Sequence, residues 1–198
     1  MTDSARKQEL LEAAYKYVLG NGLADMSLRP LAKEIGSSPR VLLFLFGSKE
    51  ELIRALLARA REAELRYLAE LRDEHVGLAV TGRDVWAWLA DPSHRALLAL
   101  WVEGYARSLL GDPGPWADFG RATVRDWLDL LAERQAADSD GLGAEAERTL
   151  LLAVLRGALL DLLATGDTER VTRAVDRHLS AVDRPRLSRP IEAPPKAP

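Results

Sequence analysis

Two cationic side chains in residues 27–49 stand where they could contact a nucleic acid. Arg40 lies near the start of a short predicted helix, and its guanidinium fork matches the O6 and N7 acceptors of guanine. Lys49 opens the next helix, whose free backbone amides also suit a phosphate. Each of them is alternatively an ordinary solvated cation. The positions therefore predict one base contact and one phosphate contact on double-stranded DNA.

The spacing of three small or apolar residues around these cations is typical of a helix-turn-helix. Ala32 allows two helices to approach closely, Gly36 permits a sharp turn, and Leu42 fills the angle between the helices. Any two short helices joined by glycine give the same pattern. The context favours the motif, because an amphipathic helix precedes it and a capping box, residues 48–51, follows it.

Residues 41–46, with the sequence VLLFLF, have two interpretations. All six could be core, but a short helix packed on one side cannot bury its whole circumference. In the interpretation we favour, Leu42, Phe44 and Phe46 pack inward. Leu43 then projects toward DNA, where an apolar side chain can contact a thymine methyl group. The orientation of Leu45 stays open.

The segments SLRPLAKEIG, residues 27–36, and FGSKEEL, residues 46–52, resemble the TetR family of bacterial transcriptional regulators. The resemblance is close over residues 9–57 and is one of architecture and length beyond them. It implies a helical homodimer that binds palindromic operator DNA and releases it when a small molecule binds. Arg29 corresponds to an arginine that often touches DNA in the family. Leu43 and Leu45 replace an aromatic residue and a histidine that often hydrogen-bond phosphates.

Together these considerations predict a set of DNA-contacting residues at the turn, the recognition helix and the following helix start. The set is Arg29, Ser37, Ser38, Pro39, Arg40, Leu43 and Lys49. Two alternatives to a ligand-released repressor stay open. One is a regulator that activates or acts without a ligand, and the other is a helical small-molecule binding protein or enzyme that binds no DNA.

The composition limits the kinds of protein the chain can be. Its 198 residues are 47% hydrophobic, carry a formal net charge of -3 and include no cysteine and three histidines. Residues 1–8 are polar, unlike a signal peptide, and no apolar run reaches the ~20 residues of a membrane helix. No catalytic, phosphate-binding or metal-ligand spacing stands out. We expect a cytoplasmic protein without membrane contact, enzymatic activity, cofactor or metal.

Helical periodicity runs through almost the whole chain, and no alternating strand pattern occurs. We predict an all-α protein of about nine helices: residues 4–19, 27–35, 38–46, 48–75, 84–89, 94–110, 116–137, 144–165 and 167–182. Residues 76–83 are expected as a loop, with Asp84 capping the helix after it. The predicted domains are a DNA-binding head, 1–47, and a ligand-binding and dimerisation domain, 48–183, in which 48–75 connects the two. Residues 184–198 are expected to be a disordered Pro-rich tail.

The predicted helix 144–165 is apolar around most of its surface, which indicates burial on several sides. One explanation is a four-helix bundle formed with the last helix by two-fold symmetry, with Gly157 as a point of close approach. The alternative is the central helix of a monomeric core.

Aromatic residues concentrate between the two helix breaks, as in ligand pockets and also in ordinary cores. We predict a cavity that binds a flat or hydrophobic effector. Its candidate residues are Trp101, Glu103, Tyr105, Trp127 and Arg156.

Overall fold

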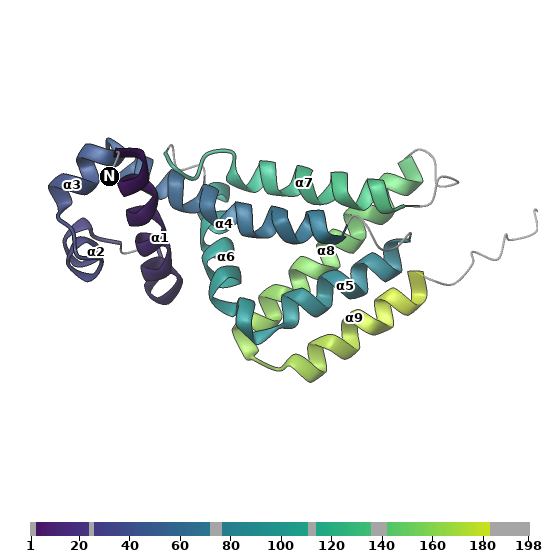
Figure 1. Cartoon of the computed structure of the whole chain (residues 1–198). Helices are drawn as coiled ribbons and strands as arrows, with labels where there is room; N and C mark the ends of the chain where they lie inside the picture. Colours follow the sequence, from purple (N-terminus) through teal and green to yellow (C-terminus); the bar gives the residue numbers. More distant parts are fainter. Residues whose placement is uncertain (1–2, 24–25, 72–76, 111–113, 136–141, 183–198) are drawn as a thin grey trace, which may run out of the picture.

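The computed structural model describes residues 3–23, 26–71, 77–110, 114–135 and 142–182, and within them it is all helical, as predicted (Figure 1). Its elements are α1 Asp3–Asn21, α2 Leu28–Glu34, α3 Pro39–Phe46, α4 Lys49–Leu71, α5 Leu78–Ala90, the 3-10 turn η1 Pro92–His94, α6 Arg95–Leu109, α7 Phe119–Arg134, α8 Leu142–Thr165 and α9 Thr168–Val182. The helices α1 to α3 group at one end, and α4 leads away from them into the other helices. The predicted tail, 184–198, lies outside the described residues.

Local side-chain chemistry explains where the helices around the head begin. The Ser38 hydroxyl accepts a hydrogen bond from the Val41 amide at 3.2 Å, and Pro39 occupies the first turn of α3. The Ser48 hydroxyl accepts one from the Glu51 amide at 3.0 Å and so caps α4. Gly36 adopts a φ of 65° in the turn between α2 and α3, which favours glycine there. These predicted helix starts and this turn are confirmed.

The helix α5 differs from the prediction. Residues 78–83 were expected to be part of a loop, but α5 already begins at Leu78, and Asp84 lies inside it rather than at its start. Burial explains the difference, since Leu78, Gly82, Val85 and Leu89 form one buried face. Gly82, inside this helix, allows close packing on α8 and α9.

The core consists of two apolar clusters. The first joins α1 to α3 with the first part of α4 and also includes Leu100 and Trp116. The second joins α5 to α9. Packing therefore continues past the predicted head boundary at residue 47, because Leu52 and Leu56 of α4 belong to the first cluster. Of the partly buried apolar residues that the structure describes, Trp101 alone packs against both clusters.

An ion pair also joins α1 to α4. Arg59 donates to the Glu12 carboxylate from Nε at 2.6 Å and from Nη2 at 3.2 Å. The hydrogen bond from Arg59 lowers the pKa of Glu12. The guanidinium also lies over the Tyr15 ring, 4.9 Å from its centroid. These contacts hold the head against the connecting helix.

Within the described ranges, no helix combines the length and the apolar character that a bilayer crossing requires. No cluster of three or more side chains suited to a metal ion occurs in the same residues.

The contact at Gly82 generates a prediction about stability. A Cβ atom there would lie 2.6 Å from Cδ2 of Leu179 and 3.2 Å from Cδ1 of Leu151, both of which are buried. We expect Gly82→Val to lower the free energy of unfolding by ~1–3 kcal/mol, because the packed leucines cannot move aside freely. Urea unfolding measures the change. Gly20→Val is the control, since a Cβ there meets nothing within 4 Å; equal effects of the two variants would contradict the packing argument.

Candidate functional site

The helices α2 and α3 pack as a helix-turn-helix at one end of the molecule (Figure 1). Leu31 and Ala32 of α2 and Leu42 of α3 are buried in the first cluster, and the Ser37 amide donates to the Ala32 carbonyl at 2.8 Å across the turn. The close approach expected at Ala32 and the buried position expected for Leu42 are both present. The second helix of the motif, α3, therefore has one face fixed inward and the other open.

The open face of α3 is apolar, and it differs in one residue from the prediction. Leu42 and Phe46 are buried and Leu43 is 41% exposed, as expected, but Phe44 is 75% exposed, so its predicted inward position is wrong. A helix turns ~100° per residue, so residues four apart share a face and a residue two apart points the other way. Leu45 is half-buried and packs against the first cluster.

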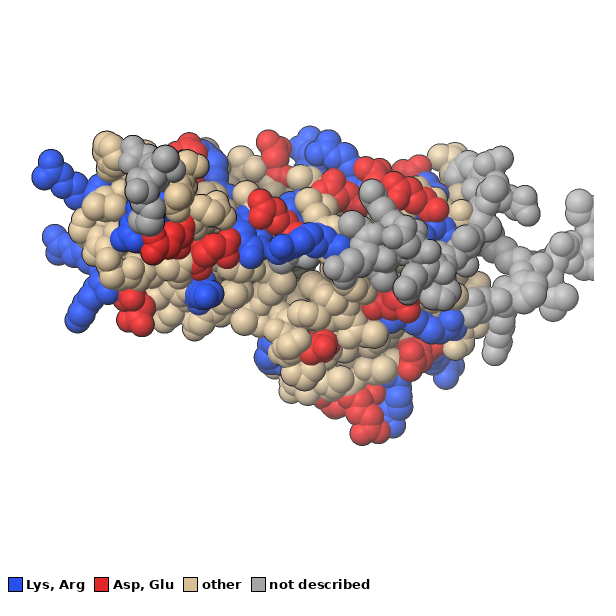
Figure 2. Space-filling model, viewed as in Figure 1, with Lys and Arg blue, Asp and Glu red and all other residues tan. Residues whose placement is uncertain are grey.

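The segment that contains this open face carries more cations than acids. Residues 27–49 carry four Lys and Arg residues against one acid, Glu34. Arg29 and Arg40 are exposed and Lys49 is half-buried. Figure 2 shows blue side chains projecting from the end of the molecule that α2 and α3 form.

The remaining predicted DNA-contacting residues lie at the start of α3. The Ser38 hydroxyl caps the helix, Pro39 begins it, and Ser37 is half-buried. The Ser37 hydroxyl is buried without a hydrogen-bond partner among the described residues. All seven predicted residues therefore lie on or beside the helix-turn-helix.

A cavity of about 40 Å³, or about 500 Å³ when the open solvent at its mouth is counted, lies among α4, α5, α6, α7 and α8. Of the predicted ligand residues, Trp101, Trp127 and Arg156 line it. Trp101 stacks on Tyr105 with ring centroids 5.0 Å apart, and the Tyr105 hydroxyl accepts a hydrogen bond from Arg156 at 3.3 Å. Tyr105 thus stands behind the wall rather than in it.

Glu103 is not among the residues that line the cavity. Its Oε2 accepts a hydrogen bond from the backbone amide of Leu23, after α1, at 2.8 Å. Its Oε1 is buried without a partner among the described residues. A residue two positions from Trp101 on a helix faces away from it, so Glu103 contacts the head while Trp101 faces the cavity.

The prediction missed Glu64, a buried acid in the cavity wall. Its Oε1 accepts a hydrogen bond from Trp127 Nε1, and its Oε2 accepts one from Arg61 at 3.0 Å. Burial raises the pKa of Glu64, and Arg61 and the Trp127 hydrogen bond partly oppose this. Arg61 also pairs with Asp126. Glu64 follows Leu57 and Ala60 at helical spacing, and this acid on an apolar stripe was the available signal.

Arg156 is the other charge at the cavity. Its guanidinium carbon lies 5.8 Å from the Trp101 ring centroid and 5.1 Å from that of Tyr105. Burial lowers the pKa of Arg156. Its Nε and Nη2 atoms are buried and have no hydrogen-bond partner among the described residues. Trp101 Nε1 is also buried without a hydrogen-bond partner among the described residues.

A second open surface follows α8. Leu150 and Leu160 are more than half exposed, and Ala153 and Gly157 between them are exposed as well. A Cβ atom at Gly157 would meet nothing within 4 Å. These residues recur at spacings of three and four, so they share one face of the helix. We refer to this surface, with Ala164 as its fifth member, as the α8 stripe.

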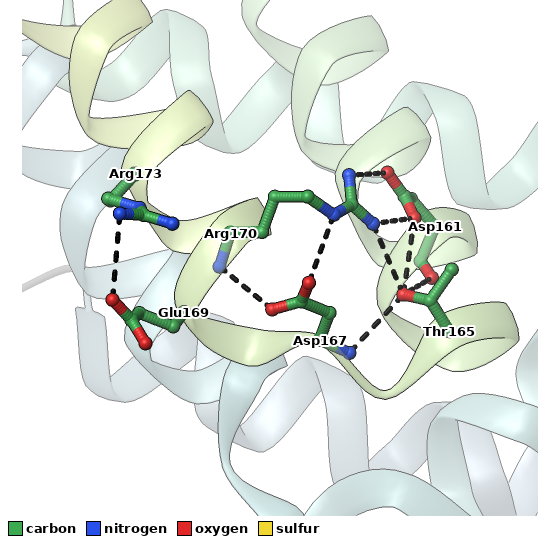
Figure 3. A network of polar contacts seen from close by, with 6 residues as sticks. All are labelled: Asp161, Thr165, Asp167, Glu169, Arg170 and Arg173. Carbon is green, nitrogen blue, oxygen red and sulfur yellow. Dashed lines mark hydrogen bonds and ion pairs between the residues drawn. The ribbon is translucent and has the colours of Figure 1, made fainter.

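Polar contacts fix the angle between α8 and α9 beside this stripe. Arg170 pairs with both oxygens of Asp161, Nη1 to Oδ2 at 2.9 Å and Nη2 to Oδ1 at 2.6 Å (Figure 3). Its Nε donates to Asp167 at 3.2 Å, and the Asp167 amide donates to the Thr165 hydroxyl at 3.2 Å. The hydrogen bond from Arg170 lowers the pKa of Asp161. These exposed contacts link the end of α8 to the start of α9.

Comparisons with known proteins identify the fold and the head. Residues 10–56 match the family model described as bacterial regulatory proteins, tetR family. The chain is 31% identical over 178 residues to the HTH-type transcriptional repressor AcnR of Corynebacterium diphtheriae, with 87% of this chain and 89% of the relative covered. The chain therefore belongs to the TetR family of DNA-binding transcriptional regulators.

Solved structures agree with this assignment. A TetR transcription regulator from Haloarcula marismortui shares the fold with a TM-score of 0.71 at 18% identity, over 90% of this chain and 96% of that one. The multidrug binding protein EbrR, complexed with imidazole, has a TM-score of 0.65 at 26% identity, with 92% of each chain covered.

The buried Glu64 generates a prediction about pH. Because burial raises its folded pKa, the unfolded chain loses this proton first as the pH rises, and wild-type stability then falls relative to a neutral residue. We expect Glu64→Gln to gain stability over the wild type from about pH 4, near the unfolded pKa, up through the higher folded pKa. Below that window the difference should not change with pH. Urea unfolding at a series of pH values measures it.

The control for this prediction is Glu62→Gln, on the exposed side of α4. This variant should follow the wild type across the series. A stability difference for Glu64→Gln that shrinks as the pH rises would contradict the expected sign.

Proposed function

We propose that this protein is a cytoplasmic repressor that binds a palindromic operator as a homodimer and releases it when a small, largely apolar effector enters the cavity. The observation that carries the proposal is the open apolar face of α3, in a helix-turn-helix that has four cations and one acid over residues 27–49. The similarity to a transcriptional repressor over most of both chains supports the direction of regulation.

On this proposal, the residues of the head divide the work of binding DNA. Arg40 is exposed at the start of α3 and reads a guanine, whereas Lys49, at the start of α4, binds a phosphate. Leu43 and Phe44 present apolar surface to the groove and suit the methyl group of thymine. The other predicted contact residues lie on or beside α3 and would face the DNA backbone: Arg29, Ser37, Ser38 and Pro39.

The α8 stripe supports the homodimer. Leucines that stay more than half exposed beside alanine and glycine form a flat apolar strip, which is costly in water and suits a second helix. A two-fold axis beside α8 and α9 would bury the strip against its own copy in a four-helix contact. Such a dimer sets two α3 helices about one DNA turn apart, ~34–36 Å, and so requires a palindromic operator.

The position of the cavity supports release by an effector. Its wall includes Ala60 and Glu64 of α4 and Trp101 of α6, and both helices also pack on the head. Glu103 of α6 holds the backbone at Leu23 directly. An effector that binds the DNA-free arrangement better by ~1–3 kcal/mol would lower operator affinity about 5- to 150-fold. EbrR, of the same fold, holds imidazole, which supports a ligand cavity.

The test of DNA binding separates the two cations. An operator is first selected from random DNA with the full-length protein. We expect Arg40→Ala to weaken operator binding by ~1–3 kcal/mol and to relax the preference at one base position, because a bidentate base contact is lost. We expect Lys49→Ala to weaken binding to all sequences and to lower the salt slope by about one unit. Gel shifts over a range of salt concentrations measure both effects.

Arg95→Ala is the control for these variants, because Arg95 lies at the start of α6, where it donates to the Leu163 carbonyl at 3.0 Å. It should leave operator binding unchanged. Equal losses on selected and random DNA for both head variants would refute the division of work, and failure to select any operator would refute the proposed function.

The homodimer makes its own prediction. Leu160 is 52% exposed in the α8 stripe, and Leu160→Glu would place a charge at the two-fold contact. We expect this variant to sediment as a monomer at micromolar concentration and to lose operator affinity. Leu109→Glu is the matched control, since Leu109 is 69% exposed at the end of α6. If the wild type is itself monomeric, or if Leu160→Glu stays dimeric, the α8 stripe is not the interface.

A further inference from the structure

The cavity wall offers hydrogen-bond donors that nothing accepts. Arg156 Nε, Arg156 Nη2 and Trp101 Nε1 are all buried without a partner among the described residues. A buried donor left unpaired costs free energy, and a charged one costs more. Three of them on two neighbouring side chains at one cavity indicate a missing acceptor.

The two Arg156 nitrogens without a partner, Nε and Nη2, form one edge of the guanidinium group. Nη1 is already used, because it donates to the Tyr105 hydroxyl at 3.3 Å. Nε and Nη2 present parallel N–H groups, the geometry that receives both oxygens of a carboxylate. The Trp101 and Tyr105 rings lie close to the guanidinium and limit its movement.

The nearest acid of the wall does not supply the missing acceptor. Both oxygens of Glu64 are engaged, Oε1 by Trp127 and Oε2 by Arg61 at 3.0 Å. Arg61 pairs with Asp126 as well as with Glu64, and no ion pair joins Glu64 to Arg156 among the described residues, although the charge of each acts on the pKa of the other. Arg156 therefore faces the cavity as a cation without an ion-pair partner among the described residues.

The rest of the wall selects the body of the ligand. Trp88, Trp127, Leu155 and Leu159 contribute flat and aliphatic surface with few polar atoms. The space inside the cavity that a water-sized molecule can reach is only about 40 Å³, and the figure of 500 Å³ includes open solvent, so the cavity suits a small ring rather than a long chain. A cationic ligand would meet the positive charge of Arg156, and both oxygens of Glu64, the acid that lines the cavity, already accept hydrogen bonds.

We propose that the effector is a small aryl carboxylate, whose carboxylate binds Arg156 Nε and Nη2 and accepts from Trp101 Nε1 while its rings lie between the tryptophans. This inference rests on the proposed function only in calling the ligand an effector, that is, a ligand that releases DNA. Binding of the acid to the cavity is a property of the protein without DNA, and it is tested without DNA.

The experiment is isothermal titration calorimetry, which measures the affinity of the full-length protein for matched probes. Benzoate, 1-naphthoate and 2-naphthoate are compared with their neutral primary amides, which keep the ring and the shape. We expect at least one acid to bind ~10- to 100-fold more tightly than its amide, because charge-assisted hydrogen bonds to a guanidinium are stronger than neutral ones. Equal affinities for acids and amides, or no binding of any acid at millimolar concentration, would overturn the proposal.

Variants then assign the binding to Arg156. Arg156→Met should remove the preference for the acid and leave the affinity for the amide within about twofold, because the methionine keeps the apolar wall. Arg156→Lys should keep part of the preference, since it holds a charge without the fork. Arg121→Met, an exposed arginine on α7, is the matched control and should bind like the wild type. Unchanged acid binding by Arg156→Met would place the acid elsewhere and overturn the assignment.

The comparison of acid with amide in the wild type does not depend on whether the variants fold. A gel shift with the selected operator and the tightest acid then separates the two proposals. If the acid binds and the operator stays bound, the carboxylate site stands and release by that acid fails. If the operator binds and no acid does, the DNA-binding function stands and the carboxylate site fails.

Discussion

The packing of α6 against both apolar clusters is the constraint on which the rest of the structure depends. Trp101 contacts both clusters, and Leu100 beside it is buried in the first. The approach is close because α6 has a glycine at the crossing: a Cβ at Gly104 would lie 3.0 Å from Leu57 and 3.3 Å from Phe119. A Cβ there would force Leu57 and Phe119 to move by a few tenths of an ångström, and a larger side chain would push α6 away from α4 and α7.

One consequence is that successive residues of α6 serve different parts of the molecule. Trp101 lines the cavity, Glu103 holds the backbone at Leu23, and Tyr105 accepts a hydrogen bond from Arg156. A helix moves as a rigid body over this length, so a displacement that fits a ligand at Trp101 also shifts Glu103. The proposed release of DNA therefore needs no chain of small adjustments, only a change in how α6 sits between the clusters.

The sequence predicted what depends on local chemistry, and it failed where packing decides. The caps at Ser38 and Ser48, the turn at Gly36 and the fold class follow from neighbouring residues and are confirmed. The first six residues of α5, 78–83, were expected as a loop, because their helical conformation depends on burial against α8 and α9 at Gly82, which the local sequence does not show. Phe44 was misplaced because the prediction put every second residue, 42, 44 and 46, on the buried face, which is the periodicity of a strand and not of a helix. The contact between Glu103 and Leu23 joins residues 80 positions apart, and no local pattern encodes it.

Departures from the ordinary rule of burial mark each surface to which we assign a function. Large apolar side chains are usually inside and charges outside. Phe44 and Leu160 are exposed, whereas Glu64 is buried and Arg156 is partly buried with unpaired donors. Each arrangement costs stability in the isolated chain, and an aliphatic residue at 156 or a polar one at 44 would remove that cost. The proposed partners, namely DNA at the recognition helix, a second copy at the α8 stripe and a ligand in the cavity, would each offset that cost on binding.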